Sequence, residues 1–149
     1  AGLNRLQGQL LVDTAFARLG FLANVNYFSE RLPDGNHDQA LMTDFNALYR
    51  FTQTSWMELH AGLGARFWST HGDVNGGFNA LYRADFFPLK PWHGMALLEV
   101  GNIREALVLH AQAQIGVNFR HGEFFVGYDF LRLHRTNLQG PALGLRLWF

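Results

Sequence analysis

The sequence predicts an all-β protein, specifically a transmembrane antiparallel up-and-down β-barrel of about eight strands. Three observations support this. Apolar and polar residues alternate over long stretches, no apolar run approaches the roughly 18 residues that a membrane helix needs, and the chain ends on an alternating strand, Gln139 to Phe149. A membrane strand needs only about 9 to 11 residues, half of them apolar, so its signal is alternation and not mean hydropathy.

Composition is consistent with one closed sheet. The chain has 149 residues, enough for one domain and few for two cores. Formal charge is balanced and no basic tract is present, which argues against a nucleic-acid partner. All basic residues except Lys90 are arginines, whose planar guanidinium groups suit buried pairing with carboxylates. The absence of cysteine fits an oxidising compartment.

The first fifteen residues are ambiguous. Leu3, Leu6 and Leu10 have helical spacing, but Leu6 and Leu10 also fit one face of a strand. The sequence therefore leaves residues 1–15 open between a periplasmic extension, a short helix and a strand lead-in. We expect the barrel itself to occupy residues 16–149.

The first four predicted strands have clean alternation. In the first, Leu19, Phe21 and Val25 point outward while Asn24 and Asn26 point inward. The connections are expected to be a polar loop, a tight turn and a loop rich in Gly, Asn and Asp. These strands span about 18–27, 41–51, 57–68 and 78–86, and their connections 29–39, 52–55 and 69–77.

Prolines define the next turn, because proline has no N–H to donate to a sheet. Pro88 and Pro91 interrupt the alternation, and a turn centred on Leu89 would place Asp85 opposite His93. The fifth strand then covers about 92–100. Its inner face is less polar than the others.

A second turn is predicted at His121-Gly122, a sequence of the X-Gly form found in two-residue hairpins. It would place Arg120 opposite Glu123 and Gln114 opposite Asp129, pairs that are chemically sensible inside a barrel. The flanking sixth and seventh strands cover about 107–119 and 123–133, a loop follows at 135–139, and the terminal strand closes the barrel against 19–27.

Loop lengths predict an orientation. The turns after the second, fourth and sixth strands are tight and those after the first and third longer, as short periplasmic turns and longer external loops would give. Both termini would then be periplasmic. Outward aromatic residues should form a girdle at the periplasmic rim. The girdle residues are Tyr49, Phe51, Phe86, Trp92, Phe119 and Phe124.

The inward-facing ionisable residues are nearly matched in sign. An eight-stranded barrel has an interior just wide enough for its own side chains. We therefore expect a salt-bridged network, because unpaired charge in a low-dielectric interior is costly. The predicted lumen residues are Asp44, Arg50, Glu58, Arg66, Arg83, Asp85, Glu99, Arg120, Glu123, Asp129 and Arg146.

The end of the chain resembles the β-signal of Gram-negative outer-membrane proteins, with a terminal aromatic residue at Phe149, an apolar residue at Leu147 and a glycine at Gly144. Ala142 departs from the polar residue usual in that signal. In pattern and length, residues 16–149 resemble small eight-stranded outer-membrane barrels of the OmpA and OmpX type. This resemblance implies an outer-membrane location, contact with lipid and lipopolysaccharide, and recognition by the barrel-assembly machinery.

Other site chemistries find weaker support. His60 and His93 should lie in one half of the barrel and His110 in the other, so no metal site or cofactor is expected. Small barrels that modify lipid A exist, but Ser69 and His71 are too close in sequence to form a nucleophile and base, and the His-x-Ser pattern of lipid A deacylases is missing. A lipid-modifying enzyme and a narrow channel remain alternatives.

A soluble lipocalin-like barrel is the main structural alternative, with an apolar interior and a polar exterior. It would expose the leucine-rich face of residues 107–119 to water and bury the polar face of the same strand. We therefore expect a non-catalytic outer-membrane barrel that acts as a structural anchor or partner-binding platform. It could be a subunit of an envelope assembly with a protein partner.

Overall fold

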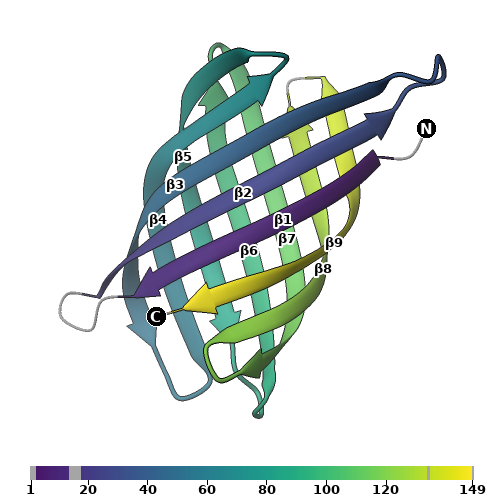
Figure 1. Ribbon diagram of the computed structural model, residues 1–149. Coiled ribbons are helices and arrows are strands. Elements are labelled where there is room, and N and C mark those ends of the chain that lie inside the picture. Colours follow the sequence, from purple (N-terminus) through teal and green to yellow (C-terminus); the bar gives the residue numbers. More distant parts are fainter. Residues whose placement is uncertain (1–2, 14–17, 134, 149) are drawn as a thin grey trace.

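The computed structural model describes residues 3–13, 18–133 and 135–148. In these residues the chain forms nine strands and no helix, and the strands close into a barrel in sequence order (Figure 1). These residues therefore contain no helix that is long and apolar enough to cross a membrane. The strands are β1 (Leu3–Asp13), β2 (Leu19–Arg31), β3 (His37–Gln53), β4 (Met57–Thr70), β5 (Asp73–Phe86), β6 (Trp92–Ile103), β7 (Ala106–Phe119), β8 (Gly122–Leu133) and β9 (Thr136–Trp148).

The strand number differs from the predicted eight because Leu3–Asp13 forms a complete strand. β1 lies between β2 and β9, pairing antiparallel with β2 and parallel with β9. The parallel seam runs only from Gln7 opposite Gly144 to Leu11 opposite Trp148. The expectation that the terminal strand closes directly against residues 19–27 is therefore wrong.

The alternation in β1 follows the strand period and not the helical one. Gln7 and Gln9 are buried in the barrel interior, whereas Leu6 and Leu10 are exposed on the outer face. The helical spacing was misleading because Leu6 and Leu10, four residues apart, lie on one face of a strand as well as on one face of a helix. Of the three interpretations left open for residues 1–15, the described part adopts the strand.

The two ends of the barrel are named here after the chain termini. At the N end β1 begins, and at the C end β9 finishes, so Leu3 and Trp148 lie at opposite ends (Figure 1). An odd strand number requires this arrangement. The prediction that both termini lie on one side rested on an even number, and it fails for these described ends.

The predicted asymmetry of loop lengths is also absent. The predicted loop 69–77 is a two-residue turn in which Thr70 pairs with Asp73. His71 and Gly72 both have positive φ, 48° and 91°, as the turn type that suits a tight hairpin requires. Five residues connect β2 to β3 at the N end, and five connect β5 to β6 at the C end. The loop 29–39 is likewise shortened, because pairing continues to Arg31 opposite His37.

Two predicted hairpin registers are shifted by two residues. Asp85 pairs with Met95 and not with His93. Glu123 pairs with Asn118, because the turn consists of Arg120 and His121. A shift of two residues keeps every side chain on its predicted face, since successive side chains in a strand alternate.

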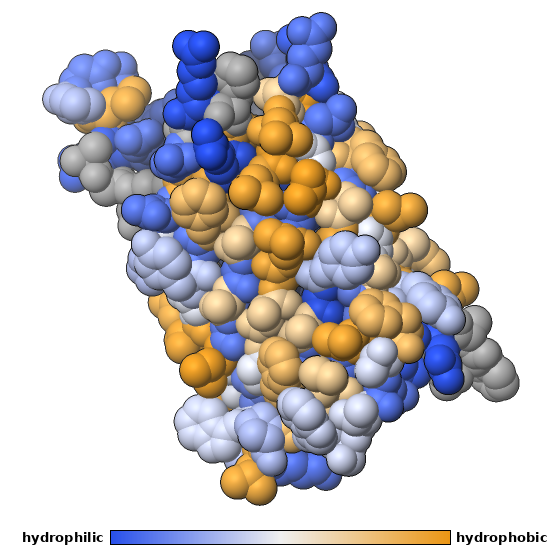
Figure 2. Space-filling model, turned by 180° about the vertical axis from the view of Figure 1, so that it is seen from behind, coloured by the Kyte–Doolittle hydropathy of each residue, from blue (hydrophilic) through white to orange (hydrophobic). Residues whose placement is uncertain are grey.

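The outer and inner faces of the barrel have opposite chemistry. Large apolar side chains are exposed on the outer face of every strand, including Leu63, Phe124 and Val126. Figure 2 shows one side of this surface, with an apolar band between more polar ends. The buried interior contains more polar and charged residues than apolar ones among the described residues.

Apolar side chains form two layers within this polar interior. One cluster lies near the N end and the other halfway along the barrel. The middle cluster separates two groups of polar side chains along the barrel axis, and the N-end apolar cluster lies beyond both of them. The N-end apolar cluster comprises Phe28, Met42, Ile103, Val108 and Leu131, and the middle cluster comprises Leu22, Leu48, Leu81, Met95 and Leu97.

Candidate functional site

Titratable and amide side chains occupy the interior in two clusters. All predicted lumen charges except Arg120 face inward. Arg50 and Glu58 lie near the C end of the barrel, and their side chains are therefore partly exposed, at 16% and 22%. Arg120 is exposed in the β7–β8 turn, so its assignment to the lumen is wrong. The C-end cluster contains Gln9, Arg50, Glu58, His60, Arg83, Asp85, His93, Gln114, Glu123 and Arg146, and the N-end cluster contains Gln7, Asp44, Arg66, Asn79, Glu99, His110, Gln112 and Asp129.

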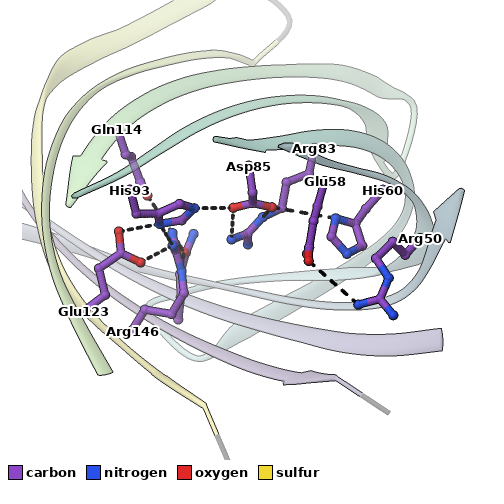
Figure 3. A network of polar contacts seen from close by, with 10 residues as sticks. Arg50, Glu58, His60, Arg83, Asp85, His93, Gln114, Glu123 and Arg146 are labelled. Atoms are coloured by element: carbon purple, nitrogen blue, oxygen red, sulfur yellow. Dashed lines mark hydrogen bonds and ion pairs between the residues drawn. The ribbon is translucent and has the colours of Figure 1, made fainter. Parts of the chain in front are cut away.

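Asp85 is the centre of the C-end cluster (Figure 3). Arg83 donates two hydrogen bonds to it, from Nε to Oδ2 at 2.7 Å and from Nη2 to Oδ1 at 2.8 Å. His93 Nε2 lies 2.7 Å from Asp85 Oδ1, and His60 Nδ1 lies 3.7 Å from Oδ2. A carboxylate with a bidentate arginine partner is held in a fixed orientation. Asp85 thus connects strands β4, β5 and β6.

Arg146 extends the same cluster across the parallel seam. Its Nη1 donates to Glu123 Oε2 at 2.6 Å, and Glu123 Oε1 lies 2.8 Å from His93 Nδ1. Arg146 also donates from Nε and Nη2 to Gln9 Oε1, at 2.9 and 2.6 Å, and from Nη2 to Gln114 Oε1 at 2.7 Å. One guanidinium therefore links β9 to β1, β7 and β8.

The N-end cluster has an excess of carboxylates. Arg66 donates from Nε to Asp44 Oδ1 at 2.6 Å, and its Nη2 lies 2.6 Å from Glu99 Oε1. His110 bridges the second oxygen of Glu99, at 3.0 Å, to Asp129 Oδ1, at 2.8 Å. One arginine and one histidine thus compensate three carboxylates in a fully buried setting.

Amides complete the hydrogen bonding of this cluster. Asn79 donates to Glu99. Gln112 Nε2 donates to Asp129 Oδ2 at 2.9 Å and to Gln7 Oε1 at 2.7 Å. These amides come from β1, β5 and β7, so each cluster fixes several strands relative to one another.

The bridging histidines are absent from the predicted lumen network, although sequence reasoning placed both of them inside the barrel. His93 and His110 each present both ring nitrogens to carboxylate oxygens. Two carboxylate acceptors are satisfied together by the imidazolium form, in which both nitrogens donate. The available signal was an inward position with acidic residues inward on the neighbouring strands. To identify the carboxylate partners from this signal, the strand register must be known, and the predicted registers of two hairpins were shifted by two residues.

In the described residues, no group of three or more His, Cys, Asp or Glu side chains is placed to hold a metal ion. His71 lies in the β4–β5 turn with its side chain 73% exposed, and its Nε2 is 3.6 Å from Asp38 Oδ1 on the neighbouring hairpin. Ser69 pairs with Val74 in the same hairpin.

The predicted assembly residues lie at the seam. Gly144 faces inward, where a Cβ atom would lie 2.4 Å from Phe125 Cζ and 2.7 Å from the Gln7 carbonyl oxygen. Leu147 is on the outer face with 37% exposure. Phe149 lies outside the described residues.

The predicted girdle residues gather on the outer face at the C end, where Trp56, which sequence reasoning did not include, stacks on Phe86 with a ring-centroid distance of 6.2 Å. Phe119 and Phe124 also contact each other, at 5.2 Å between centroids.

Comparison with known protein families, curated sequences and solved structures finds no match for this chain.

Proposed function

We propose that this protein is a non-catalytic outer-membrane β-barrel that acts as a structural anchor and as a platform for an envelope partner. One observation carries the proposal: the apolar residues are exposed outside, and the ion pairs are buried inside. In water, this outer surface would be a large contiguous apolar patch, which soluble monomers avoid. In lipid, the same surface is in a suitable solvent, and the closed sheet leaves few unpaired backbone groups.

The dimensions of the strands support this proposal. Every strand has between 11 and 17 residues, and about 9 to 11 residues suffice for a tilted membrane strand. The apolar band in Figure 2 ends in more polar rims, and aromatic side chains collect at the C end. Aromatic residues are enriched at both water interfaces of membrane barrels.

A scaffold role fits the interior better than conduction. The N-end apolar cluster fills the lumen at one level, and the two polar clusters are internally paired at others. A permeating ion would have to pass the apolar level and displace buried ion pairs. Both steps are costly in a low-dielectric interior.

The β2–β3 hairpin is the best candidate for the partner-binding surface. β3 is the longest strand, and the paired ribbon continues to Arg31 opposite His37 at the N end. Figure 1 shows the hairpin extending beyond the neighbouring turns. Functional contacts often concentrate on segments held out by a rigid scaffold. With the terminal strand ending on the periplasmic side, this hairpin would be external.

The membrane assignment is tested by refolding and electrophoresis. We expect the protein to need detergent or lipid for solubility, and to migrate differently on a gel when unheated and when boiled, because a barrel closed by nine paired strands resists unfolding by detergent. A lipid-free sample that stays monomeric and folded in buffer would refute the assignment.

The platform role is tested by shortening the hairpin. Replacing residues 30–38 with a two-residue turn should leave the heat-dependent gel shift unchanged, because the removed segment lies beyond the interior clusters.

Cross-linking through a cysteine introduced at Asp34 should give a discrete envelope adduct in cells, since the native chain has no cysteine of its own. A cysteine introduced at Glu105, in the β6–β7 turn at the same end, is the matched control. Equal adducts at both positions would contradict a hairpin-specific platform.

A further inference from the structure

The parallel seam lies beneath a groove on the outer face of the barrel. The groove has a volume of about 1060 Å³ and is lined mainly by outward-facing residues from six strands, β6 to β9 together with β1 and β2. Inward-facing residues of the barrel wall, among them Gln7, Gln9 and Phe125, also border it. Leu6, Leu10, Val25, Ile115 and Leu145 form much of its wall. No Asp, Glu, Lys, Arg or His side chain is among the described residues that line it. The wall of the barrel is thus concave here, where a typical barrel wall is convex.

Glycine helps to form the hollow. Gly8 lies on the outer face of β1 beside the seam, and a Cβ atom built on it would meet no other atom within 4 Å. The missing side chain therefore adds open space to the groove. No backbone requirement for glycine is visible at this position, because its φ is not positive.

The C end of the groove has a basic and aromatic border. Trp92 and Phe124 line the groove at this end. Lys90 and Arg120 lie in the adjoining β5–β6 and β7–β8 turns, and a hydrogen bond from Asn118 N to the Pro91 carbonyl oxygen (2.8 Å) holds the β5–β6 turn to the end of β7. Among the described side chains at this end, the charges classed as exposed are basic, namely Arg18, Lys90, Arg120 and, when protonated, His121, while Glu58 is only 22% exposed. The N end carries both signs.

We infer that the groove binds the acyl chains of an anionic phospholipid, whose phosphate lies beside Lys90 and Arg120. This inference rests on the proposed membrane location. An apolar channel without charges suits hydrocarbon chains, and a basic rim with aromatic side chains suits the headgroup region. A second copy of this chain fits less well, because a two-fold interface would set one concave surface against another.

Lipid preference can be measured through Trp92. The protein is refolded into phosphatidylcholine vesicles that contain either brominated phosphatidylglycerol or brominated phosphatidylcholine, using a variant (Trp56→Phe, Trp148→Phe) that keeps Trp92 and the interior Trp68. We expect quenching to report a preference for phosphatidylglycerol on the order of tenfold, since two basic residues act on the headgroup. The double substitution Lys90→Gln and Arg120→Gln should remove this preference.

Filling the groove provides the second arm. Gly8→Leu should reduce quenching by brominated phosphatidylglycerol severalfold, because the new side chain takes the space of an acyl chain. Gly76→Leu is the matched control: Gly76 is exposed on the outer face of β5, outside the groove, and a Cβ there makes only ordinary contact with the Phe67 ring at 3.7 Å. This control should quench like the parent.

The outcomes separate this inference from the proposed function. Equal quenching by both lipids in a barrel that inserts and shows the heat-dependent gel shift would overturn the lipid site and leave the membrane assignment standing. The role of the groove would be overturned if the preference for phosphatidylglycerol remained in the Gly8→Leu variant. It would also be overturned if soluble glycerol phosphate abolished that preference. Cross-linking that places a second copy over the groove at low protein-to-lipid ratio would also overturn it. Failure to insert would refute the membrane assignment itself.

Discussion

Replacing Arg66 with leucine is expected to lower the free energy of unfolding by about 3–5 kcal/mol, the usual cost of leaving a buried charge unpaired. Arg66 is fully buried and compensates Asp44 and Glu99 at 2.6 Å each. Without it, His110 is the only described cation beside three carboxylates of the N-end cluster. The measurement is equilibrium unfolding in urea of protein refolded into lipid vesicles.

Arg120 provides the matched control for that substitution. The sequence predicts both arginines to lie in the lumen, but the structure buries only Arg66 and exposes Arg120 in a turn. In vesicles of phosphatidylcholine alone, where no anionic lipid can occupy the proposed site, Arg120→Leu should therefore change the free energy of unfolding by less than about 0.5 kcal/mol, as surface substitutions usually do. Equal losses in the two variants would contradict a stabilising role for the buried ion-pair network.

Replacing Gly144 with valine is expected to destabilise the barrel by about 3 kcal/mol, at the upper end of the range for overpacking. The added Cβ would lie within 2.4 Å of Phe125 Cζ and 2.7 Å of the Gln7 carbonyl oxygen. Gln7 pairs with Gly144 at the start of the seam, so the clash falls where β9 meets β1. The yield of heat-modifiable protein after refolding and the free energy of unfolding both report the effect.

Gly8→Val is the corresponding control for the seam. Gly8 pairs with Leu145, one step along from Gly144, but its Cβ would point to open space. A stability within about 0.5 kcal/mol of wild type is expected, since this is a surface change without strain. Loss of the folded barrel in this variant would contradict the described geometry of the seam.

The sequence predicts which face each residue occupies much better than which residue lies opposite. Alternation over residues 107–119 correctly assigns Val108, His110 and Gln112 to the interior. The period of two needs only local information. Register depends on the turn. The turn consists of Arg120 and His121, one residue earlier in the chain than the predicted His121-Gly122.

The first strand could not be identified by the same reasoning. Leu6 and Leu10 are consistent with a helix or a strand, and Gln7 and Gln9 suggest neither alone. Their burial is explained by partners far along the chain: Gln7 by Gln112 and Gln9 by Arg146. These are long-range interactions, and a local pattern carries no information about them. Missing this strand changed the strand number and therefore the position of one chain end.

The candidate site was predictable in its charges and not in its connections. Acidic residues and arginines were expected to pair inside, because both types faced inward in similar numbers. The pairing itself joins residues such as Arg66 and Glu99, which lie on strands that are not adjacent. Such contacts across the lumen depend on the curvature of the closed sheet. The bridging histidines contact mostly adjacent strands, as His110 does with Glu99 on β6 and Asp129 on β8, so their partners depended on the register between those strands.

The central claim, that lipid covers the outer face while the polar face lines the interior, is tested most directly by spin labels along β7. Single cysteines at successive positions from Leu107 to Val117 introduce one label each into a chain without native cysteine. In lipid vesicles, labels at odd-numbered positions should be accessible to oxygen and shielded from a water-soluble nickel complex, and labels at even-numbered positions shielded from both. High accessibility of the odd-numbered positions to the nickel complex would contradict the claim.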